Sequence, residues 1–159
     1  MKTMRQKGIV MIEVVIVVSI LGIVTVGLIF ANIIYLKTAS FTLASTKATL
    51  LAQEGVEAVK YVRSGGWDTK IGALTSGTTY YLAFGTSTMW SSTTTEEVID
   101  DKFFRSFVVE DVDRDANDDI ASTGTNDPNT KNLTVRVSWL GATGTTTKQI
   151  ETYITNFIE

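Results

Sequence analysis

The carboxylates are the side chains best suited to chemistry, because the chain contains no histidine and no cysteine. An acidic run occupies residues 110–119. Its oxygen-bearing side chains alternate as do the first ligands of a calcium-binding loop: Asp111, Asp113, Asp115 and Asn117. Ala116 and Ser122 replace the glycine and the final glutamate of such a loop. Two interpretations stay open: a solvated turn between strands, or a calcium site built from Asp111, Asp113, Asp115 and Asp118.

A second carboxylate, Glu13, lies at the edge of a long apolar segment. Residues 14–36 carry no charge, and 23 helical residues at ~1.5 Å each would cross a hydrocarbon core of ~30 Å. An acidic side chain near the centre of a membrane helix costs about 2.5–3.5 kcal/mol by insertion scales, so it usually has a partner. We expect Glu13 to have one.

Enzymatic chemistry has little support in the sequence. Without histidine or cysteine the usual general base and thiol nucleophile are missing, and there is no glycine-rich phosphate loop. Glu54 and Glu57 are best interpreted as solvated helix charges. We expect a protein that is not an enzyme and has no resident cofactor, with calcium as the one open alternative.

The residues around Glu13 resemble a known signal. Lys7 and Gly8 precede the apolar stretch Ile9-Val10-Met11-Ile12-Glu13-Val14-Val15-Ile16. This pattern resembles the class III signal of type IV prepilins and pseudopilins. The resemblance implies that a prepilin peptidase cuts between Gly8 and Ile9 and methylates the new amino group of Ile9. Ile9 departs slightly from the family, which most often has Phe or Met there.

Cleavage would give Glu13 a partner. The new α-amine of Ile9 in one subunit could pair with Glu13 of a neighbour, and a low dielectric strengthens such a pair. The alternative is a single-pass anchor in which Glu13 reaches the membrane interface. A cleaved secretory signal fits poorly, because the apolar run is too long and no Ala-x-Ala site follows it.

The helical pattern continues beyond the apolar run. We predict one helix over 9–63, ended by Ser64-Gly65-Gly66, with a leader at 1–8, a transmembrane and assembly segment at 9–36, and an amphipathic continuation at 37–63. Its apolar positions are consistent with one helical face: Leu36, Leu43, Leu51, Ala52, Val59 and Val62. Three of the 14 basic residues fall in the leader, which places the N-terminus in the cytoplasm.

Residues 64–159 are predicted to form a β-rich head. Alternating and aromatic patterns predict strands at 79–84, 102–109, 133–140 and 148–157, with a turn region at 141–147. Leu133, Val135, Val137 and Trp139 should face the core. In the last strand one face should carry Ile150, Thr152, Ile154 and Asn156. Five aromatic residues are expected as core residues: Trp67, Phe103, Phe107, Trp139 and Tyr153. The expected fold is pilin-like α+β, a long N-terminal helix packed on an antiparallel sheet.

These features predict a structural subunit of an extracellular type IV pilus-like filament. A pseudopilin of a type II secretion system and an anchored binding domain that never assembles are the alternatives. The resemblance implies a prepilin peptidase, other pilin subunits, and platform and motor proteins as partners. Direct nucleic-acid binding is not expected, because removing the leader leaves 11 basic residues against 17 acidic ones. The chain should begin as a single-pass membrane protein and end in a surface filament.

Overall fold

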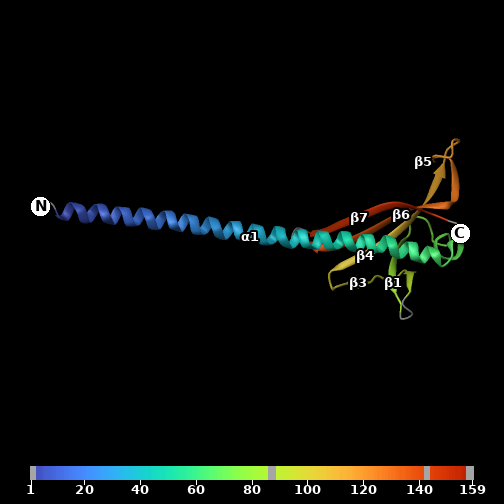
Figure 1. Cartoon of the computed structure of the whole chain (residues 1–159), viewed down its shortest axis with the longest axis horizontal. Helices are drawn as coiled ribbons and strands as arrows, with labels where there is room; N and C mark the ends of the chain where they lie inside the picture. Colours follow the sequence, from blue (N-terminus) through green and yellow to red (C-terminus); the bar gives the residue numbers. More distant parts are fainter. Residues whose placement is uncertain (1–2, 86–88, 142–143, 157–159) are drawn as a thin grey trace. The chain divides into compact units, whose positions relative to one another are not determined.

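The computed structural model describes residues 3–85, 89–141 and 144–156, with the backbone alone for 3–9 (Figure 1). The chain divides into two compact units, Met1–Leu43 and Ala44–Glu159. One helix, α1 (Thr3–Ser64), contributes to both. The helix ends one residue after the predicted position. Gly66, with φ of 123°, follows in a conformation that favours glycine.

The first unit is helical over its described residues, and its side chains from Val10 onward are exposed. Leu21 is 59% exposed and Ile23 is 74% exposed. From Val10 the helix is long and apolar enough to cross a membrane, judged by length and composition alone. This agrees with the predicted transmembrane segment at the coarse level of one spanning helix.

The second unit is an α+β domain built on a seven-stranded antiparallel sheet. A short π-helix, η1 (Trp67–Ile71), follows α1. The strands are β1 (Thr79–Phe84), β2 (Trp90–Thr93), β3 (Val98–Ile99), β4 (Phe103–Arg114), β5 (Ile120–Ala121), β6 (Thr125–Gly141) and β7 (Gly144–Thr155). The main order is β2-β1-β4-β6-β7, and β3 and β5 each pair with β4. In Figure 1 the end of β4 and the start of β6 project past the other long strands, beside β5.

The core lies between the second part of α1 and one face of the sheet. Alternate residues of β6 point into it, and Leu133, Val135 and Val137 are fully buried. The helix contributes Ala48, Leu51, Ala52, Val56, Val59 and Val62 to the same cluster. Trp67, Phe103, Phe107 and Trp139 are buried as predicted. The α+β layout and the inward face of β6 are therefore confirmed.

One expectation about the core was wrong, and it concerns Tyr153. Leu36 and Leu43, which belong to the predicted helical face, are 59% and 73% exposed and lie outside the core cluster. Tyr153 is 50% exposed, because it alternates with buried Ile154 and therefore faces away from α1. Thr152 and Ile154 do share the less exposed face, as predicted.

The strand boundaries also differ from the prediction. β4 runs on through Arg114, so half of the acidic run is strand. β6 begins at Thr125, because its polar first residues pair with the end of β4. The turn predicted over 141–147 is shorter, since Gly141 pairs with Gly144. Phe157, the last residue predicted for the final strand, lies outside the described residues.

Candidate functional site

The predicted processing and assembly residues lie on α1. The backbone of Gly8 and Ile9 is helical, while their side chains fall outside the described part of the structure. Glu13 is exposed on the same helix. Its neighbours Met11 and Ile12 are 71% and 64% exposed. The carboxylate is therefore surrounded by apolar surface that lies open within this single chain.

The four predicted calcium ligands are not brought together. Among the described residues no three His, Cys, Asp or Glu side chains form a group that could hold a metal. Asp111 accepts a hydrogen bond from the ammonium group of Lys131, which lowers its pKa. That bond pairs the carboxylate with a cation of the protein itself. The calcium site stays a prediction that this geometry does not favour.

The other predicted ligands take different roles. Asp113 lies in β4 opposite Ala121 and Asn126. The Asp115 carboxylate accepts backbone N–H bonds from Asn117 (2.8 Å) and Asp119 (3.1 Å). These two bonds lower the pKa of Asp115. They also stabilise the turn that follows β4.

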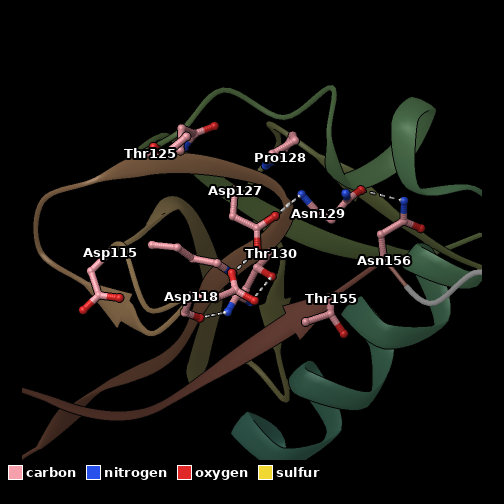
Figure 2. Close-up of a pocket in the computed structure, with 11 residues that line it drawn as sticks. Asp115, Asp118, Thr125, Asp127, Pro128, Asn129, Thr130, Thr155 and Asn156 are labelled. Atoms are coloured by element: carbon pink, nitrogen blue, oxygen red, sulfur yellow. Dashed lines mark hydrogen bonds and ion pairs between the residues drawn. The ribbon is translucent and has the colours of Figure 1, made fainter.

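Asp118 belongs instead to a polar cluster centred on Arg114, the last residue of β4. The Arg114 Nη1 donates to the backbone carbonyl of Asp118 at 2.7 Å. Its Nε donates to the Asp127 carboxylate at 2.7 Å, and its Nη2 donates to the Thr130 hydroxyl at 3.3 Å. The Asp118 carboxylate lies 3.6 Å from Nε. Figure 2 shows the labelled side chains of Asp118, Asp127 and Thr130 close together, with these bonds drawn as dashed lines.

Local backbone geometry creates this cluster. The register of β4 against β6 shifts between Asp111 and Val112, which brings Val112 opposite Asp127. Such a shift bends the strand and re-aims its side chains. A Cβ atom on Gly124 would lie 2.1 Å from the carbonyl oxygen of Arg114. Only glycine allows the two chain segments to approach this closely.

The cluster borders a shallow cavity, open to solvent, of about 610 Å³. We call it the Arg114 cavity, and its lining residues are Arg114, Asp115, Asp118, Thr125, Asn126, Asp127, Pro128, Asn129, Thr130, Thr155 and Asn156. At its rim the Asn156 amide nitrogen donates to the Asn129 side-chain oxygen at 3.1 Å. The Asn129 backbone N–H donates to Asp127 at 2.9 Å.

The electrostatics of the Arg114 cavity favour binding over catalysis. The Arg114 hydrogen bond, helped by Thr130 and the Asn129 backbone N–H, lowers the pKa of Asp127 to about 2. The bond to Asp127 in turn raises the pKa of Arg114. Both groups therefore stay charged at neutral pH. A carboxylate of such low basicity is a poor general base.

Sequence reasoning missed Asp127, Asn129, Thr130 and Asn156. The stretch Asn126-Asp127-Pro128-Asn129 has the composition of a turn, yet it lies within β6. Asn156 comes much later in the sequence, directly after the end of β7. A signal that could have indicated the pairing is the lone Arg114 within the acidic run.

Comparison with protein-family models, with curated proteins and with solved structures finds no match for this chain.

Proposed function

We propose that this protein is a structural subunit of a type IV pilus-like surface filament, made as a membrane-anchored precursor. The observation that carries the proposal is the five-residue spacing from Gly8 to Glu13, followed by an apolar helix with exposed side chains. Exposed apolar surface of this extent must be covered by lipid or by other helices. A filament core built from neighbouring copies would cover it after the subunit leaves the membrane.

Glu13 supports assembly in a defined register. In a bundle of identical helices its charge is costly unless it is paired, and cleavage after Gly8 would supply the amine of Ile9 as that partner. Buried polar pairs are best attested as devices that fix register. The head, with its own core, would then be displayed on the filament surface.

The first test is the mass of the mature chain, purified from membranes or filaments of cells that express the gene and a prepilin peptidase. We expect a chain that begins at Ile9 and carries one additional methyl group. A chain with Met1 still attached in those cells would contradict the proposal and support the anchored binding domain.

The second test replaces Glu13 by Gln. This substitution removes the charge and keeps the length, so membrane insertion should persist while surface filaments seen by electron microscopy disappear. Glu57→Gln, on the same helix but in the head, is the matched control and should leave filaments intact. Normal filaments from the Glu13 variant would refute the register role. If the wild type forms no surface filament and the Glu13 variant loses protein secretion, the outcome would favour a pseudopilin.

A further inference from the structure

We propose that the Arg114 cavity is a binding site for a neutral saccharide. The proposal concerns the head alone and does not depend on filament assembly. It rests on three properties of the cavity: its size, its balance of charge, and the hydrogen-bonding groups at its rim.

The size and lining suit a small polar ligand. A cavity of about 610 Å³ lies within the range of roughly 300–1,000 Å³ typical of ligand sites. Of the described lining residues, Pro128 alone lacks a polar side chain. The polar groups of the cavity are carboxylates, amides, hydroxyls and one guanidinium, and most of the residues that carry them are labelled in Figure 2. A ligand that lies in it can therefore form hydrogen bonds with several of these groups.

The charges disfavour an anion, and the carboxylates are too engaged to hold a metal ion. Three carboxylates and one guanidinium line the cavity. This excess of negative charge repels anions. A metal ion is also disfavoured, since the two oxygens of Asp127 accept from Arg114 Nε and from the Asn129 backbone N–H. Asp118 in turn lies within 3.6 Å of the Arg114 cation.

The rim presents donors and acceptors side by side. The two asparagine amides bond head to tail, which leaves the Asn129 amide nitrogen and the Asn156 side-chain oxygen with no hydrogen bond among the described residues. Arg114 uses three of its five N–H groups in the bonds named above. Adjacent sugar hydroxyls both donate and accept, so they complement this arrangement. The groups are already fixed by internal bonds, which lowers the entropic cost of binding.

The test uses the full-length protein in a zwitterionic detergent that has no sugar headgroup. A glycan array carrying neutral, sialylated and sulfated glycans is the probe, followed by calorimetry with the neutral glycan that is best retained. We expect retention of neutral glycans. Asn129→Ala with Asn156→Ala should weaken binding by about tenfold or more, the effect of losing two hydrogen bonds.

Gln149→Ala is the matched control, because it removes an exposed amide of β7 that does not line the cavity. It should bind as the wild type does. If the double variant unfolds, Asn129→Asp replaces the donor by an acceptor while retaining the shape, and it should weaken binding as well. Retention of no neutral glycan, retention of charged glycans only, or equal affinity of wild type and variants would overturn the proposal.

Discussion

At the scale of single residues, Arg105 of β4 joins the helix to the sheet. Its side chain is 4% exposed. Nη1 donates to the Leu51 carbonyl at 3.3 Å and to the Glu54 carboxylate at 3.1 Å. The guanidinium lies 5.0 Å from the ring centre of Trp90. Its Nε is buried without a hydrogen-bond partner in the described structure, so the burial of this cation is only partly compensated.

Replacing Arg105 by Met should therefore change the free energy of unfolding by less than about 1 kcal/mol, because an apolar chain of similar length fills the site. Arg105→Ala should cost about 2–4 kcal/mol, since it leaves a cavity in the core. Urea unfolding of the full-length protein in detergent measures both. Arg136→Ala on the exposed side of β6 is the control and should stay within about 0.5 kcal/mol. An Arg105→Met variant as unstable as Arg105→Ala would show that the polar contacts dominate.

Asp127 gives the domain an acid-sensitive contact. Its pKa is about 2 in the folded protein and ordinarily 3.8, so the folded state favours the carboxylate. The ion pair of Asp127 with Arg114 contributes its full stability above the ordinary pKa of the carboxyl group. That contribution is lost as the pH falls toward 2. Asp127→Asn should therefore lower the melting temperature at neutral pH and reduce its decline between pH 5 and 2. Thermal unfolding at a series of pH values tests this, with Glu97→Gln as an exposed control.

An equal decline in wild type and Asp127→Asn would show that other carboxylates dominate acid unfolding. Asp111 and Asp115 are the relevant alternatives, because the pKa of each is also lowered in the folded protein.

At the scale of elements, Gly55 sets the distance between α1 and the sheet. A Cβ at this position would lie 2.8 Å from Val135 Cγ1 and 3.1 Å from Arg105 Cδ. Both neighbours are buried, so neither can move aside easily. The absence of a side chain is therefore what permits this close packing.

Gly55→Ala improves helix propensity by about 1 kcal/mol, but overpacking a core costs about 1–3 kcal/mol. We expect a net loss of about 1 kcal/mol, and a larger loss for Gly55→Val. Urea unfolding measures both, with Gln53→Ala on the exposed side of the helix as the control. A stabilised Gly55→Ala variant would mean that the helix shifts away from Val135 at little cost.

The elements differ in how far their sequences could predict them. The helix and the inner face of β6 follow from periodicity, because burial selects apolar residues at regular spacing. The extensions of β4 and β6 do not, since Asp, Asn and Thr there resemble a loop. They pair because Arg114 is held by Asp127 and Thr130 across the two strands. These contacts join residues 13 and 16 positions apart, and the sequence offers little signal for them beyond the lone Arg114 within the acidic run.

At the scale of the whole molecule, the two units differ in whether their apolar side chains are buried. The first has exposed apolar side chains throughout its described part, and none of the described residues before Ala44 belongs to the core cluster. The second has a core built from Ala44 to Val62 of α1, η1 and the sheet. The sequence predicts that the helix over 37–63 packs on the head at 64–159. The compact unit that holds the core begins at Ala44.

A chain that begins at Ala44 should therefore fold without detergent and keep a cooperative unfolding transition. One that begins at Trp67 lacks the helical half of the core and should not fold. Circular dichroism and urea unfolding in plain buffer distinguish the two. The control is the full-length protein in detergent, whose head should unfold at a similar urea concentration, because the core residues are the same. Aggregation of both fragments would show that residues 1–43 contribute to folding of the head itself.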